Sequence, residues 1–267
     1  MHTFDYLRPA TLKDAAAFLK KNENARVLGG GQSLIPTLKM RLAQTPALVD
    51  VNRIDELRGV KLEGVVLTVG AGMRHHEVAT SKDVLLGIPA LARVAAGIGD
   101  RQVRNMGTLG GSLANNDPAA DYPAAVLGLG ATVHTNRRSI TADKFFVGLY
   151  ETALKPGEII TSVEFPLPKH AAYVKFKNPA SRFALVGVFV SVGAGQVRVA
   201  VTGAANGVFR IKDMEKKLGE KFAPEAIAKS KIAADKLNGD LHASAEYRAH
   251  LIPLLVQRAV VAALSEK

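Results

Sequence analysis

Gly29-Gly30-Gly31-Gln32-Ser33 is the stretch of sequence that decides the fold of the first part of the chain. It follows Arg26-Val27-Leu28, which predicts a strand, and it leads into a predicted helix over 34–40, with Ser33 near the N-cap and Pro36 in the first turn. Glycines at a helix start leave backbone N–H groups uncovered by side chains, and such groups bind anions, most often a phosphate. The stretch therefore predicts a strand–turn–helix unit that holds a phosphate.

A second stretch, Thr108-Leu109-Gly110-Gly111-Ser112, repeats this chemistry with a hydroxyl at each end. Two such cradles indicate a ligand with an extended polyanionic middle, such as the pyrophosphate of a dinucleotide. The Rossmann fingerprint G-x-G-x-x-G is not met, because Leu34 stands where its last glycine would be. The Gly-Lys-Ser/Thr of a Walker loop is also missing. The sequence therefore disfavours a Rossmann nicotinamide site and a Walker site.

Composition excludes several classes of function. The chain has 267 residues, of which 48% are apolar, and no cysteine. Without cysteine it cannot form disulfides, thiolate zinc sites, a cysteine nucleophile or an iron–sulfur cluster of its own. The net charge of +11 comes from scattered Lys and Arg, which favours a solvated basic surface, or one facing acidic partner subunits, over nucleic-acid binding. We expect no integral membrane segment, no secretory signal and a cytoplasmic location.

The order of patterns predicts an α+β chain in three parts: 1–56, 57–167 and 168–267. The first part reads as a β-α-β unit and the second as strands and helices around the second glycine stretch. The Pro166-Leu167-Pro168 segment marks the second boundary, because paired prolines interrupt helices and ladders alike. Beyond it the sequence predicts three strands, over 173–177, 185–192 and 196–202. Three helices then follow, near 209–218, 224–237 and 244–265, the last interrupted by Pro253.

Few side chains suggest chemistry of their own. Asp117 is interpreted as the N-cap of a helix over 117–127. Asp121, one turn later, could cap the helix, remain solvated or accept hydrogen bonds from sugar hydroxyls of the ligand. His75-His76 does not predict a metal site, because adjacent histidines point in different directions and no third ligand stands nearby. No catalytic triad and no carboxylate pair is visible, so we expect a cofactor-binding chain without acid/base machinery.

Several stretches in the right order resemble the FAD-binding medium subunit of molybdenum hydroxylases, the group of carbon monoxide dehydrogenase and xanthine dehydrogenase. The resemblance extends over nearly the whole chain. The stretches that carry it are 28–36, 103–114, Asp117-Pro118-Ala119-Ala120-Asp121-Tyr122-Pro123, Phe145-Phe146-Val147-Gly148, 154–161 and Ala243-Ser244-Ala245-Glu246-Tyr247-Arg248.

The resemblance implies a two-lobed FAD-binding module of the vanillyl-alcohol-oxidase/MurB (PCMH) type, followed by a small C-terminal antiparallel sheet with helices. It places Gly29, Gly30, Gly31, Gln32, Ser33 and Leu34, with Thr108, Leu109, Gly110, Gly111 and Ser112, around the cofactor's pyrophosphate. It assigns Asp121 to polar groups of the cofactor, Ile160 to a backbone position beside the flavin ring, and Lys175 to the isoalloxazine edge. Phe183 stands where some relatives place a tyrosine against the flavin, so the apolar contact is kept and the hydroxyl is lost.

The resemblance also implies an oxidoreductase subunit that carries FAD and no metal. The molybdenum cofactor and 2Fe-2S clusters are then expected only on partner subunits, a large and a small one, in a dimer of heterotrimers. Electrons would pass from those clusters through the flavin to an external acceptor such as a quinone, NAD or oxygen. Two alternatives stay open: a stand-alone flavin oxidoreductase, and a flavin-free assembly or binding protein of the same fold.

Overall fold

Three parallel strands form the sheet of the N-terminal lobe. The structure, a computed structural model that describes residues 1–265, arranges them in the order β1-β3-β2. Thr11 accepts a hydrogen bond from the Asp14 amide and caps the first helix. The second helix begins directly after the first glycine stretch, but the Ser33 side chain makes no capping bond. The elements are β1 (Asp5–Leu7), α1 (Leu12–Lys21), β2 (Arg26–Leu28), α2 (Leu34–Lys39) and β3 (Ala47–Asp50).

The middle lobe is built on a five-stranded antiparallel sheet in the order β4-β5-β10-β6-β7. Its strands are β4 (Val60–Glu63), β5 (Val66–Gly70), β6 (Thr132–Thr135), β7 (Ser139–Thr141) and β10 (Ile160–Pro166). Its helices are α3 (His75–Thr80), α4 (Lys82–Gly87), α5 (Pro89–Ala96), α6 (Arg101–Met106), α7 (Leu109–Asn115), α8 (Tyr122–Leu129) and α9 (Ala142–Phe145). A short hairpin, β8 (Phe146–Gly148) with β9 (Glu151–Thr152), follows α9. Helix α8 is buried along its whole length, so it forms the centre of this lobe.

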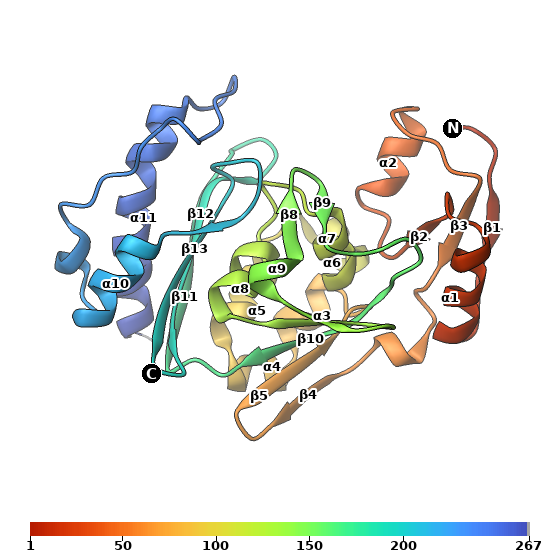
Figure 1. Cartoon of the computed structure of the whole chain (residues 1–267), viewed down its shortest axis with the longest axis horizontal. Coiled ribbons are helices and arrows are strands. Elements are labelled where there is room, and N and C mark those ends of the chain that lie inside the picture. The colour runs from red at the N-terminus through yellow and green to blue at the C-terminus, as the bar shows by residue number, and fades with distance from the viewer. Residues whose placement is uncertain (266–267) are drawn as a thin grey trace.

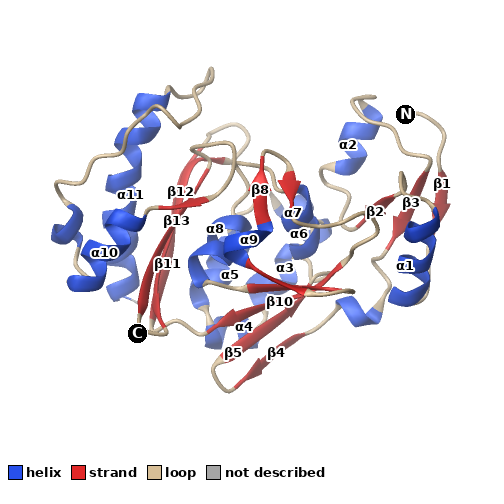
Figure 2. Cartoon of the chain, in the orientation of Figure 1, coloured by secondary structure: helices blue, strands red, loops and turns tan. Residues whose placement is uncertain are grey.

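The C-terminal lobe is a four-stranded antiparallel sheet covered by helices, and Figures 1 and 2 show it at the opposite end of the molecule from the N-terminal lobe. Its elements are β11 (His170–Lys177), β12 (Ala184–Gly193), β13 (Gln196–Thr202), β14 (Phe209–Arg210), α10 (Lys212–Glu220) and α11 (Ala245–Ser265). Strand β12 is buried on both faces. Its Val186, Val188 and Val190 pack with residues of α10 and α11, and Phe189 packs in the core of the middle lobe. The near-continuous apolar run of β12 follows from this two-sided burial.

The structure corrects two expectations in the C-terminal part. Only Pro224–Ile227 of the helix predicted over 224–237 is helical, as one 3-10 turn. Helix α11 runs through Pro253 without interruption, because flanking residues such as Ile252 and Leu255 are buried against the sheet and hold it in place. The division into 1–56, 57–167 and 168–267 stays a prediction. Within residues 1–265, none of the helices combines the length and apolar character needed to cross a bilayer.

Candidate cofactor site

The first glycine stretch carries a run of uncommitted backbone donors. Within the described residues, no protein acceptor pairs with the amides from Gly30 to Leu34. Gly31 has a φ of +71°, a left-handed conformation of the kind found where successive backbone N–H groups bind an anion. Helix α2 starts here, since Ile35 N donates to Gly31 O at 3.1 Å. The stretch therefore has the uncovered amides predicted for it.

Three polar residues for which the sequence predicted no role, Tyr6, Asp50 and Asn52, form a hydrogen-bonded group that holds this stretch. Asn52 donates through Nδ2 to Gly29 O at 2.8 Å and to Asp50 Oδ1 at 2.7 Å. The Tyr6 hydroxyl donates to the second carboxylate oxygen of Asp50. Because the Gly29 carbonyl is held toward Asn52, the following amides are free to face away from it. In the sequence, the feature that could have pointed to these residues is the pair of polar side chains, Asp50 and Asn52, at the end of the buried strand 47–50.

The second glycine stretch is not the turn that the sequence predicted. Leu109 begins helix α7, and Thr108 is its N-cap, accepting from Gly111 N at 3.1 Å. Leu109 N donates to Met73 O, Gly110 N to Ala71 O and Ser112 N to Thr108 O, at 2.8 to 3.0 Å. The prediction that these amides are uncovered donors is wrong, because helix and loop packing satisfies them. Thr108 is 4% exposed and its hydroxyl already accepts from Gly111 N, whereas no partner is recorded for the Ser112 hydroxyl in the described residues. The cofactor roles predicted for this stretch stay predictions.

The glycines of both stretches allow close packing between segments far apart in the sequence. A Cβ on Gly30 would lie 2.1 Å from Met106 O, and one on Gly29 would lie 2.9 Å from Thr108 Oγ1. A Cβ on Gly110 would lie 2.7 Å from Ala71 Cβ. The two stretches therefore lie against each other, as a single site requires.

His75 packs against Gly107, the residue that precedes the second glycine stretch. Its amide donates to Gly107 O at 2.9 Å, and its ring lies 5.3 Å from that of Tyr122, centroid to centroid. Burial, with a smaller contribution from the Arg104 charge, lowers the His75 pKa to about 4, so the ring is neutral at neutral pH. Among the described residues no group of histidines and acids has the arrangement of a metal site. His75 is therefore a packed, neutral imidazole.

Asp121 lies in a buried polar cluster at the junction with the C-terminal lobe. Its Oδ1 accepts from the Tyr173 hydroxyl at 2.5 Å, and its Oδ2 accepts from Lys175 Nζ at 3.0 Å. Burial raises the pKa of Asp121, an effect that Lys175 and Tyr173 partly offset. Asp121 precedes helix α8 without capping it through its side chain. Asp117 does not cap a helix either, since α8 begins at Tyr122; its carboxylate accepts from Ala119 N at 2.9 Å.

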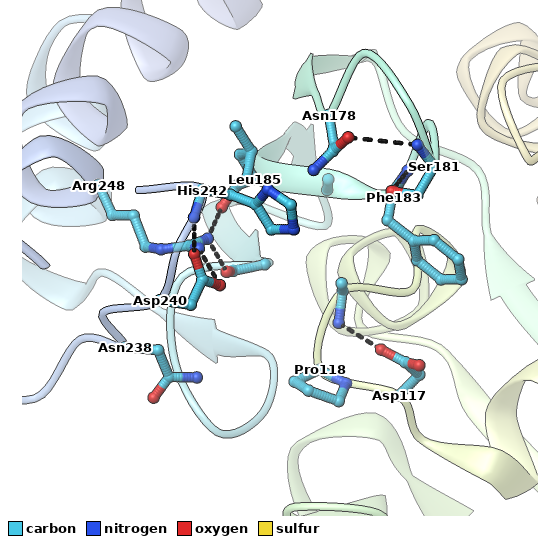
Figure 3. Close-up of a pocket in the computed structure, with 13 residues that line it drawn as sticks. Asp117, Pro118, Asn178, Ser181, Phe183, Leu185, Asn238, Asp240, His242 and Arg248 are labelled. Atoms are coloured by element: carbon cyan, nitrogen blue, oxygen red, sulfur yellow. Dashed lines mark hydrogen bonds and ion pairs between the residues drawn. The ribbon is translucent and has the colours of Figure 1, made fainter. Parts of the chain in front are cut away.

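Two further predicted residues, Ile160 and Phe183, lie in different places: Ile160 near the glycine stretches and Phe183 at a cavity beside the C-terminal lobe. Ile160 is buried at the start of β10, next to Thr161, whose carbonyl accepts from Ala71 N at 2.9 Å. Since Ala71 O accepts from Gly110 N, Ile160 belongs to the glycine side. Phe183 is 49% exposed and lines an open cavity of about 260 Å³ between the Asp117 turn and the C-terminal lobe (Figure 3). In the described chain, no hydrogen bond joins Asp121, Lys175 or Phe183 directly to either glycine stretch.

Arg248 forms the opposite wall of that cavity, as Figure 3 shows. It is 3% exposed and donates through Nη1 to Leu185 O at 2.5 Å and Gly203 O at 2.7 Å, and through Nη2 to Asp240 Oδ2 at 2.6 Å. Gly203 N in turn donates to Pro118 O at 2.8 Å. The tail motif 243–248 thus supports the 117–121 segment through the C-terminal sheet.

Comparisons with known proteins show the family of the chain. Residues 2–168 match the family model described as the FAD binding domain in molybdopterin dehydrogenase. The chain is 36% identical to the nicotine 6-hydroxylase medium subunit of Paenarthrobacter nicotinovorans, over 97% of this chain and 96% of that protein. It is 33% identical to the glyceraldehyde dehydrogenase medium chain of Sulfolobus acidocaldarius, over 96% of each.

The structure is also similar to a chain in a solved carbon monoxide dehydrogenase from Hydrogenophaga pseudoflava that lacks the Mo-pyranopterin moiety of its cofactor. The TM-score is 0.92 at 34% identity, covering 99% of this chain and 98% of that one. The family model thus covers more than half of the chain, and relatives above 30% identity align along nearly all of it. The chain belongs to the family of FAD-binding medium subunits of molybdenum hydroxylases.

Proposed function

We propose that this chain binds FAD and passes electrons through it within a molybdenum hydroxylase complex. The observation that carries the proposal is the run of uncommitted amides from Gly30 to Leu34, packed against the Thr108 segment in a chain of this family. These amides fit the diphosphate of FAD, because adjacent N–H groups at a helix start bind phosphate oxygens. FAD, when bound, supplies the redox chemistry that the side chains of the site do not.

Each predicted residue has a role in holding the cofactor. Gly29 through Leu34 bind the diphosphate, and the hydroxyls of Thr108 and Ser112 complete that pocket beside Leu109, Gly110 and Gly111. Ile160 offers backbone to the flavin ring, and Asp121 accepts hydrogen bonds from polar groups of the cofactor. Lys175 and Phe183 shape the environment of the ring. We assign His75 no role in proton transfer, because its ring is buried, packs against Tyr122 and lies behind the Gly107 turn.

The source and destination of the electrons lie outside this chain. We propose a large subunit with the molybdenum cofactor and a small subunit with 2Fe-2S clusters as partners, since relatives are named medium subunits and this chain has no cysteine for a cluster. The positive net charge of the chain suits contact with acidic partner surfaces. The dimer of heterotrimers, the external acceptor and the cytoplasmic location stay predictions.

Two glycine variants test the amide pocket. Gly31→Ala strains a φ of +71° inside the pocket, and Gly195→Ala strains a φ of +73° in the β12–β13 hairpin, where nothing lies within 4 Å of the added Cβ. We expect Gly195→Ala to lower the unfolding free energy by about 1 kcal/mol and Gly31→Ala by somewhat more, because its added Cβ would also lie 3.0 Å from Ile35 Cγ1 and 3.2 Å from Leu28 Cδ1. Only Gly31→Ala should weaken FAD binding, because only there does the backbone face the diphosphate. Titration of the purified chain with FAD, followed by flavin fluorescence, measures this difference.

Three results would argue against the proposed function. A chain that binds no FAD at any concentration, with or without its partners, would favour the flavin-free binding protein. Equal FAD affinity in both variants would remove the amide pocket. Reduction of the bound flavin by an organic substrate, with no partner subunit present, would favour a stand-alone oxidoreductase.

A further inference from the structure

The loop between β11 and β12, residues 178–183, is braced by its own first residue. Asn178 is buried and accepts at Oδ1 from Ala180 N at 2.9 Å and Ser181 N at 3.2 Å. Its backbone donates to Phe183 O at 2.8 Å and accepts from Arg182 N at 2.9 Å. The loop is therefore a compact unit whose direction depends on how it is attached to the rest of the protein.

Lys175 supplies that attachment. Its ammonium group donates to Gly97 O at 3.0 Å, Asp121 Oδ2 at 3.0 Å and Arg182 O at 3.1 Å. These are all three hydrogens that a lysine has, and the side chain is 10% exposed. Lys175 thus cross-links three segments: the turn after α5, the start of α8 and the 178–183 loop.

The residue that Lys175 holds has an unusual backbone. Arg182 has a φ of +63°, a left-handed conformation that is unfavourable for a side chain with a Cβ and persists only where surrounding contacts impose it. The contacts here are the bond from its own amide to Asn178 O within the loop, the Lys175 bond to its carbonyl, and its own Nη1 bond to Gly99 O at 3.4 Å; of these, the last two attach it to other segments. Phe183 follows directly, so its ring direction depends on the conformation at Arg182.

We propose that Lys175 is a positioning residue, which ties the 178–183 loop to Asp121 and thereby fixes Phe183 at the cavity wall. The hydrogen bonds from Lys175 to the loop and to Asp121 form without a cofactor. A role for them in placing Phe183 against the flavin rests on the function proposed above. This inference gives Lys175 a route of action other than a direct charge on the flavin ring. It also couples the loop to Asp121, because any group that competes for Oδ2 loosens the contact that holds Lys175.

The absence of tryptophan makes the loop easy to observe. Phe183→Trp introduces the single indole of the chain at a half-exposed position. In that background, and without FAD, we expect Lys175→Met to lower the fluorescence anisotropy of the indole and to raise its acrylamide quenching constant. The matched control is Lys177→Met, on the same strand at an exposed position for which no side-chain contact is recorded in the described residues. Lys175→Arg, which keeps a cationic donor, should restore part of the anisotropy.

A second variant covers the case in which Lys175→Met does not fold. The double variant Lys175→Met with Asp121→Asn removes both charges, so no unpaired carboxylate stays buried, and it should show the same loss of anisotropy. If Lys175→Met or the double variant has the same anisotropy and the same quenching constant as Lys177→Met, the proposal that Lys175 positions the loop is wrong. Affinity for FAD is measured separately in the same proteins. A mobile loop with unchanged FAD affinity would uphold the tie and reject its use at the flavin, and a chain that binds no FAD would reject only the proposed function.

Discussion

A buried side-chain polar atom without a partner is uncommon in a folded protein, and the described residues contain a few. Among the described residues they are His75 Nδ1, Asn116 Oδ1, Tyr122 Oη and Arg248 Nε. The rings of His75 and Tyr122 lie 5.3 Å apart, centroid to centroid. Such atoms cost free energy unless an ordered water bridges them. The arrangement makes protonation of His75 costly as well, because the charged ring would find neither an acceptor nor solvent.

The His75 ring should therefore make the stability of the chain depend on pH. Its pKa is about 4 in the folded chain and about 6.5 when unfolded, so between these values the unfolded chain binds more protons. Stability is then lost as the pH falls, by about 2 kcal/mol between pH 7 and pH 5. Urea unfolding at both pH values measures this loss. In His75→Gln the loss should be smaller by that amount, and in the exposed neighbour His76→Gln it should persist. An identical loss in both variants would assign the dependence to other groups.

At the scale of elements, the glycines matter more for packing than the sequence suggested. The sequence predicted that both stretches expose backbone N–H groups to a ligand. Only the first has free N–H groups, because helix α7 begins inside the second. A helix that starts at Leu109 could not be read from Thr108-Leu109-Gly110-Gly111-Ser112, since two glycines lower helix propensity. Contact with Met73 and Ala71 outweighs that preference.

Replacing these glycines tests the packing directly. Gly30→Ala would force a Cβ toward the Met106 carbonyl, and Gly110→Ala would force one toward Ala71 Cβ. We expect each to cost about 1–3 kcal/mol in unfolding free energy, with Gly30→Ala the more severe because backbone yields less than a methyl group. Gly219→Ala, in helix α10 with open space around it, should be neutral or stabilise by up to about 1 kcal/mol. Chemical denaturation compares the three, and a Gly30→Ala protein as stable as Gly219→Ala would refute the close contact.

At the scale of the whole molecule, the sequence predicted the strands of the C-terminal sheet well and the contacts between distant segments poorly. Apolar runs such as 185–192 and 196–202 predicted β12 and β13, because strand periodicity and turn residues are local signals. The Asp121–Lys175 contact joins residues 54 positions apart, and no local pattern encodes such a pairing. The helix predicted over 224–237 forms only the 3-10 turn Pro224–Ile227, although residues such as Ile227 and Ile232 pack in the C-terminal core, so the local pattern did not decide the backbone there. Family resemblance supplied residue roles that local physics could not.

Arg248 should be the side chain that holds the C-terminal lobe in register with the 117–121 segment. Its loss in Arg248→Met leaves the carbonyls of Leu185 and Gly203 without a donor, at a cost of about 1–3 kcal/mol for each unsatisfied group. The Gly203 amide, bonded to Pro118 O, should then exchange its hydrogen faster, because the turn that presents it is no longer held. Arg258→Met, an exposed arginine later in α11, is the matched control and should change neither quantity. Hydrogen exchange read at Gly203 distinguishes a junction from a local packing effect: loss of stability with unchanged exchange there would confine Arg248 to the C-terminal lobe.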